Sequence, residues 1–268
     1  MAYTERGILM IWRENEDAFV MIRQHDHAKL SGEFARHWKP EYIEQDERWD
    51  EVLIGCEQHD RGWIPLDEIP LWDDAKQIPF SFMHFPEPAK LVFYRYGINE
   101  LEQMTPYGGM LASYHYGALV GHYGEEDPFG IAFVKEEKER QERIKAQLNP
   151  NEKALKFHRS ILELCDDLSL YVCLNDPGVS KENEQEWWKE GFEVGKKFAF
   201  TDEQAIMPRW VDEHTISLSP FPFEAPFELE LIYRKVSKSH IQQSGLAEAF
   251  ADADKQTWTI AFVPAESE

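Results

Sequence analysis

The chain has 268 residues, 43% of them hydrophobic, which is enough to bury a substantial core. Its formal net charge is −22, from 28 basic and 50 acidic residues, and this field would repel nucleic acids and anionic membrane surfaces. Three scattered cysteines, none in a CxxC pair, argue against a secreted disulfide scaffold and against a thiolate zinc site.

The first segments are short and apolar, and they are followed by helical patterns. Residues 8–12 and 18–22 flank a polar stretch, which predicts a β-hairpin. Residues 62–87 are rich in Pro, Trp and Phe and read as an ordered, irregular loop. The nearly all-charged segment 135–147 is typical of an exposed helix face or a lid. The remaining helices are predicted over 24–38, 40–60, 108–122 and 152–174.

The C-terminal third alternates between apolar and polar residues, as in strands of an antiparallel sheet with one buried face. The alternating positions are Ile216, Leu218, Phe227, Leu229, Leu231, Tyr233, Trp258, Ile260 and Phe262. Because an isolated hairpin is only marginally stable, the N-terminal hairpin is expected to join these strands. We therefore predict one mainly α, α+β domain over 1–268. It has a helical core at about 24–174 and a small antiparallel sheet from about 7–22 and 200–264.

Two His-Asp dipeptides occur, His25-Asp26 and His59-Asp60. A chain of this composition is expected to contain about half of one such dipeptide by chance, so the dipeptides by themselves are weak evidence of a site. Helical rotation of about 100° per residue is more informative. It places His27 on the apolar stripe of its helix and turns His25 to the opposite side. His59 and Asp60 flank the end of the next stripe, so both reach inward.

Two later helices add similar groups. His115 shares a face with apolar residues of 108–122. Asp166 sits at the edge of the stripe of 152–174, whereas Asp167 is turned nearly away. Burying several such groups is costly unless they are paired or bind a cation. Imidazole and carboxylate ligands without thiolate suit Fe, Mn, Zn or Co, so we expect one or two divalent transition-metal ions.

These residues resemble a known pattern. In the HD superfamily of metal-dependent phosphohydrolases, a His on one helix precedes a His-Asp doublet at a helix end and an Asp on a later helix. His27, His59-Asp60 and Asp166 follow this order. Residues 59–62 look like the HDxG form of the doublet, and residues 165–169 look like the small-Asp-x-Leu-Ser segment of that superfamily.

The resemblance covers about 24–174 and implies an HD-type helical core. Some branches add two histidines between the doublet and the last Asp, giving a two-metal site, and His84 and His115 stand in that interval. The chain also looks like a bacterial group in which Gly-Trp follows the doublet. Several branches carry a Lys where this chain has Trp63, so the role of that Lys does not transfer.

The leading hypothesis is a cytoplasmic metal-dependent hydrolase of a small phosphorylated metabolite or nucleotide, with Asp60 also orienting the attacking water. Trp63 either lines a substrate pocket or seals its loop onto the helices, and His158 is either a core histidine or a substrate contact. The same ligands would serve an HD-type di-iron oxygenase. A third alternative is a non-catalytic ligand-binding or interaction module. No membrane or nucleic-acid partner is expected, and a homodimer is left open.

Overall fold

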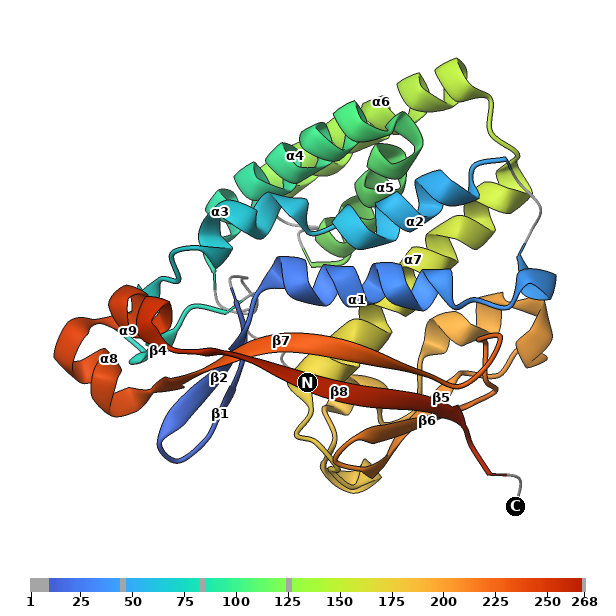
Figure 1. Ribbon diagram of the computed structural model, residues 1–268. Helices are drawn as coiled ribbons and strands as arrows, with labels where there is room; N and C mark the ends of the chain where they lie inside the picture. Colours follow the sequence, from blue (N-terminus) through green and yellow to red (C-terminus); the bar gives the residue numbers. More distant parts are fainter. Residues whose placement is uncertain (1–9, 44–46, 82–84, 124–126, 267–268) are drawn as a thin grey trace.

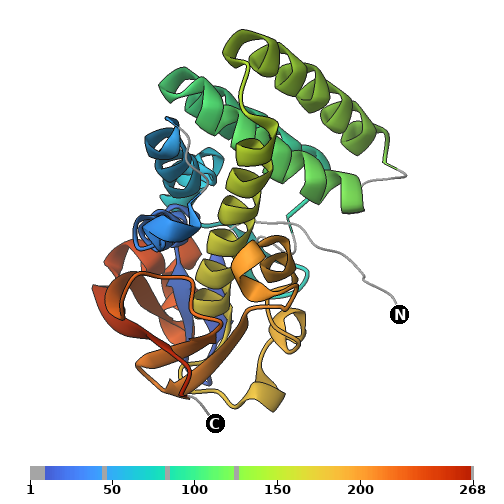
Figure 2. The same cartoon turned by 90° about the vertical axis from the view of Figure 1, so that its right-hand side faces the viewer.

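A computed structural model describes residues 10–43, 47–81, 85–123 and 127–266. A group of helices lies over one face of a mixed β-sheet, and the long helix α7 (Glu152–Leu174) runs from the helices down to the sheet (Figure 1, Figure 2). Within these residues no helix is both long enough and apolar enough to span a bilayer. The predicted α+β class is confirmed.

The helical part contains six further α-helices and two short 3-10 turns. Asn151 caps α7 by accepting hydrogen bonds from the amides of Lys153 and Ala154. Asp127 caps α6 in the same way through the amide of Gly130. The bounds are α1 (Gln24–Arg36), η1 (Pro40–Tyr42), α2 (Trp49–Gln58), η2 (Arg61–Trp63), α3 (Ile64–Asp67), α4 (Glu87–Met104), α5 (Pro106–Tyr123) and α6 (Pro128–Leu148).

The main sheet has the strand order β1-β2-β7-β8-β6-β5. Its strands are β1 (Ile11–Glu14), β2 (Ala18–Ile22), β5 (Met207–Asp212), β6 (Thr215–Ser219), β7 (Phe227–Ser237) and β8 (Lys255–Pro264). The N-terminal hairpin β1–β2 pairs with β7, so the predicted joining of the two ends of the chain is confirmed. The prediction of a purely antiparallel sheet is wrong for one pair, because β6 and β8 run parallel.

The helices and the sheet share one apolar core. Phe34 of α1 packs edge-on against Phe262 of β8, with ring centroids 4.8 Å apart, and stacks on Phe223 at 5.9 Å. Arg13 of β1 donates hydrogen bonds to the carbonyl oxygens of Cys173 and Asn175, at 3.1 and 2.6 Å. These carbonyls have no partner within the helix, so Arg13 ties the C-terminal end of α7 to the sheet.

Several elements were not predicted from the sequence. The helix α4 had no counterpart, and the segment expected to be irregular contains α3 and a small sheet of β3 (Trp72–Asp73) and β4 (Ile78–Pro79). Two short helices, α8 (Lys238–Ser244) and α9 (Leu246–Asp252), connect β7 to β8. Between α7 and β5 the chain forms 3-10 turns: η3 (Lys181–Asn183), η4 (Glu186–Trp188), η5 (Glu193–Lys197) and η6 (Ala199–Thr201).

Candidate metal centre

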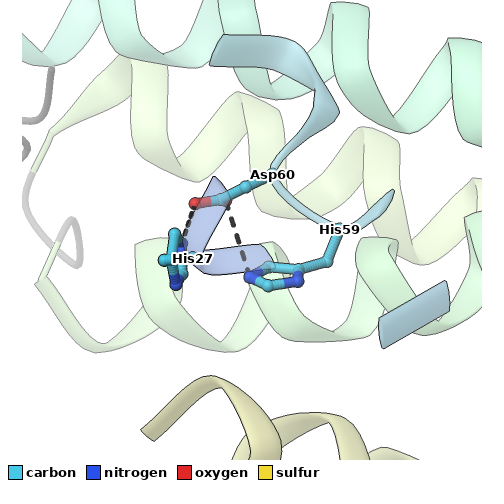
Figure 3. Close-up of side chains that lie close together, drawn as sticks. All are labelled: His27, His59 and Asp60. Carbon is cyan, nitrogen blue, oxygen red and sulfur yellow. Dashed lines mark hydrogen bonds and ion pairs between the residues drawn. The ribbon is translucent and has the colours of Figure 1, made fainter. Parts of the chain in front are cut away.

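Four of the residues predicted to hold a metal meet in the interior between α1, α2, α5 and α7. His27 comes from α1, His59 and Asp60 directly follow α2, and Asp166 comes from α7. Figure 3 shows His27, Asp60 and His59 turned toward one another, with Asp60 between the two imidazoles. His27 and His59 are both only 1% exposed, so their rings are shielded from water.

His27 is held at both ring nitrogens. Its Nε2 lies 2.7 Å from Asp60 Oδ2, and its Nδ1 lies 2.8 Å from the hydroxyl of Ser169. Ser169 itself donates to the carbonyl oxygen of Asp166 at 2.8 Å, so its hydroxyl proton is already used. Nδ1 of His27 is therefore the donor toward Ser169, and Nε2 is the atom that faces the cluster.

His59 has the same arrangement with different partners. Its Nδ1 lies 2.8 Å from the carbonyl oxygen of Cys56, which can only accept, so Nδ1 carries a proton. Its Nε2 lies 3.1 Å from Asp166 Oδ1. A histidine that donates one ring N–H to an outer partner and presents the other nitrogen is the usual form of a metal-ligating histidine.

Asp60 is oriented from two sides. Tyr116 of α5 donates its hydroxyl proton to Asp60 Oδ1, while Oδ2 faces His27. Burial favours the neutral acid, but the nearby imidazoles of His59 and His27 outweigh it and hold the pKa of Asp60 well below its usual value. Asp60 is thus a fixed, ionised carboxylate.

Asp166 and His115 form a second group of donors together with His59. His115 of α5 places Nε2 3.6 Å from Asp166 Oδ2, and its ring lies 5.5 Å from that of His59. The ligand atoms of His27, His59 and Asp60 lie within 4.8 Å of one another, and so do those of His59, His115 and Asp166. The predicted ligands His27, His59, Asp60, His115 and Asp166 are therefore brought together.

The donor set fits a divalent transition metal. With Nδ1 of His59 already protonated, Nε2 and Asp166 Oδ1 are two acceptors in contact unless a cation or a second proton lies between them. Although burial opposes a charge there, the carboxylates of Asp60 and Asp166 raise the pKa of His59 to about 10. The surrounding charge thus favours a cation at this point, and imidazole and carboxylate are ligands of Fe, Mn, Zn and Co.

A cavity of about 1010 Å³ lies next to this cluster and is lined in part by His27, Asp60, His115 and Asp166. One wall is a face of α4, with Glu87, Lys90 and Tyr94 at helical spacing. Another part of the lining is a face of α7 together with Trp187, Trp188 and η5. The volume is in the range of small-molecule sites.

Four residues beside the cluster or the cavity were not assigned a role from the sequence. Asp167 was expected to point nearly away, but it lines the cavity, because the turns after α7 build a wall on that side. Trp188 donates its indole N–H to Asp167 at 3.2 Å, while burial and the adjacent Asp166 raise the pKa of Asp167 to about 7. Tyr116 and Ser169, the partners of the ligand residues, carry no sequence signal beyond their places beside His115 and in the segment 165–169.

The remaining predicted site residues lie elsewhere. Trp63 is 1% exposed and packs against Phe93 and Tyr94 of α4, so it seals its segment onto that helix and does not line the cavity. His158 is fully buried and hydrogen-bonds through Nδ1 to the hydroxyl of Tyr107 at 2.8 Å, away from the cavity. These positions favour a packing role for both residues. His84 lies outside the described residues.

Comparisons with known proteins place the chain in a family. No curated protein and no solved structure matches it. One family model matches residues 10–238, which is most of the chain and includes every residue of the cluster, and it ends just after β7. By this match, the chain belongs to the family described as "Protein of unknown function (DUF3891)".

Proposed function

We propose that this protein is a metal-dependent hydrolase of a small phosphorylated metabolite or nucleotide. The observation that carries the proposal is the cluster of His27, His59, Asp60 and Asp166, in which the outer nitrogens of both histidines are already bound by Ser169 and Cys56. His27, Asp60 and Asp166 of this cluster line a cavity. Such preorganised donors are what a catalytic metal requires.

His27, His59, Asp60 and Asp166 would hold one metal ion, and His115 would help to hold a second. When bound, the metal would polarise a phosphoryl oxygen and lower the pKa of water. Asp60 keeps a fixed position because Tyr116 donates to one of its oxygens, and that carboxylate is suited to orienting a water molecule. Apolar side chains such as Leu119, Leu170 and Val194 limit the access of bulk water.

Basic side chains around the cavity favour an anionic substrate. Lys90, Arg159 and Lys197 all line it, in a chain whose net charge is −22. Lys90 is only 5% exposed and pairs with Glu87 at 3.0 Å, which holds its amino group beside the cavity. Lys90 and Lys197 each pair with a glutamate, so Arg159 and a bound metal ion would offset most of the repulsion that the acidic residues exert on a phosphorylated molecule.

A di-iron oxygenase is the second candidate, because the donor group of His27, His59 and Asp60 and the donor group of His59, His115 and Asp166 share His59 and together suit two metal ions. All three cysteines are buried and unpaired, which agrees with a reducing compartment, and we propose a cytoplasmic location for either activity.

The test is phosphate release by protein loaded with Mn²⁺ or Fe²⁺, assayed against phosphomonoesters and nucleotides, with oxygen uptake followed in parallel. We expect phosphate release by the wild type and loss of it in Asp60→Asn and Asp166→Asn. The control is Asp26→Asn, which alters the other His-Asp dipeptide at a salt bridge with Lys29. Oxygen consumption without phosphate release by the iron-loaded protein would favour the oxygenase and overturn the hydrolase.

A further inference from the structure

A stripe of charged residues leads from the metal centre along α7. Asp166, Glu163, Arg159 and Lys156 are separated by three, four and three residues, so they share one face of the helix. With a rise of 1.5 Å per residue, the backbone of Arg159 lies about 10 Å from that of Asp166, and the backbone of Lys156 about 15 Å. The helix therefore carries cations at a fixed distance from the metal centre.

The same stripe joins the cavity to a second hollow. A groove of about 1120 Å³ adjoins the cavity, and Arg159, Glu163 and Lys197 line both. Among the residues that the structure describes, four basic side chains line the groove, against two acidic ones. The basic ones are Lys153, Lys156, Arg159 and Lys197, and the acidic ones are Glu41 and Glu163. A local positive excess on a chain of charge −22 indicates a binding surface for an anion.

Two of these cations have no carboxylate partner in the part of the chain that the structure describes. Arg159 places its guanidinium 4.0 Å from the ring centroid of Tyr114, which orients the group without neutralising it. Lys156 forms no ion pair with a described residue. Lys197 pairs with Glu163 at 2.6 Å, so it is held at the junction of the two hollows. A guanidinium fixed on an aromatic ring is suited to bidentate binding of a phosphate.

We propose that the substrate carries two anionic groups, of which one reacts at the metal centre and the other binds at Arg159, Lys156 and Lys197, about 10–15 Å away along α7. This inference rests on the proposed function and specifies its substrate class: an elongated molecule with phosphate-like charge at both ends.

The probes are alkane-α,ω-diol bisphosphates of increasing length and the alkyl monophosphates of equal length. Their binding to Mn²⁺-loaded protein is measured by isothermal titration calorimetry. We expect one chain length at which the bisphosphate binds at least tenfold more tightly than its monophosphate, since a second charge-assisted contact contributes about one order of magnitude. The double variant Arg159→Gln/Lys156→Gln should reduce this ratio to less than about twofold, because it removes the second charge-assisted contact and keeps the metal ligands.

The matched control is Lys138→Gln, which removes one charge from an exposed position on α6. It should keep the bisphosphate advantage. A bisphosphate that binds no better than the monophosphate at any length, or an advantage that survives in the double variant, would overturn the inference. Failure of the proposed function gives a different result, because monophosphates would then bind the metal-loaded and metal-free proteins equally.

Discussion

The contact between Gly97 and Gly62 makes the strongest prediction about how the fold positions the doublet. Gly97 lies within α4, and Gly62 follows Asp60 by two residues. A Cβ atom on Gly97 would lie 2.7 Å from the Cα of Gly62 and closer still to its amide nitrogen. That is at least 0.7 Å nearer than the 3.4 Å at which ordinary contact begins. Because the opposing atoms are backbone, no rotamer change relieves the overlap.

Two effects of Gly97→Ala oppose each other. Replacing a glycine inside a helix by alanine raises the free energy of unfolding by about 1 kcal/mol. Overpacking costs about 1–3 kcal/mol, and a backbone clash belongs at the upper end of that range. The expected net result is a loss of about 2 kcal/mol of unfolding free energy, which lowers the melting temperature by roughly 4–8 °C for a chain of this size. Movement of residues 61–62 should also weaken metal binding.

Gly117→Ala on α5 is the matched control. The nearest atom to its added Cβ is Gln141 Nε2 at 3.5 Å, an ordinary contact, so only the helix-propensity gain of about 1 kcal/mol remains. Thermal denaturation and Mn²⁺ titration of both variants measure the difference. The reasoning is refuted if Gly97→Ala is as stable as the wild type, or if the two variants shift the melting temperature in the same direction.

Two further predictions concern the groups around the cluster. Tyr116→Phe removes the hydrogen bond to Asp60 and should weaken metal binding by about 10-fold or more. The control Tyr94→Phe should leave metal binding unchanged, because the Tyr94 hydroxyl has no hydrogen-bond partner among the described residues. Equal losses of metal affinity in the two variants, measured by calorimetry, would contradict this prediction. Burial raises the pKa of Asp67 to about 7, although it accepts backbone hydrogen bonds at the start of α1. A folded-state pKa above the unfolded value means that its stabilising contribution is complete below about pH 4 and is lost as the pH rises through about 7. Denaturant unfolding should therefore show that the stability of the wild type falls relative to that of Asp67→Asn between about pH 4 and pH 7. A stability difference between the two proteins that stays constant over this pH range would contradict the raised pKa of Asp67.

Elements with one-sided apolar patterns could be predicted from the sequence. The helix α7 agrees with the predicted range 152–174, because its stripe is continuous and Asn151 caps its start. The helix α4 was missed because its apolar residues surround the axis: Val92 is 60% exposed and Tyr96 is 43% exposed, while Tyr94 is buried. The parallel pairing of β6 with β8 was missed because alternation reports which face is buried and not the order of strands.

The candidate ligands were predicted because helical rotation fixes which side chains point inward. His27, His59, Asp60, His115 and Asp166 all depend on that rule, and the structure brings them together. The cavity walls did not follow from the sequence. The role of Trp63 was left open between a substrate pocket and a packing position because α4, the helix that covers it, was not predicted. The inward position of Asp167 depends on the irregular turns after α7, which have no periodicity to read.

The central claim is that the cluster binds a metal, and inductively coupled plasma mass spectrometry tests it most directly. Wild type, His59→Ala and His25→Ala are purified without chelator or metal-affinity tag, and circular dichroism confirms that each is folded. We predict about one or two transition-metal ions per chain in the wild type and in His25→Ala, and a loss of metal in His59→Ala. The absence of bound metal from the wild type, even after reconstitution with Mn²⁺ and Fe²⁺, would contradict the account.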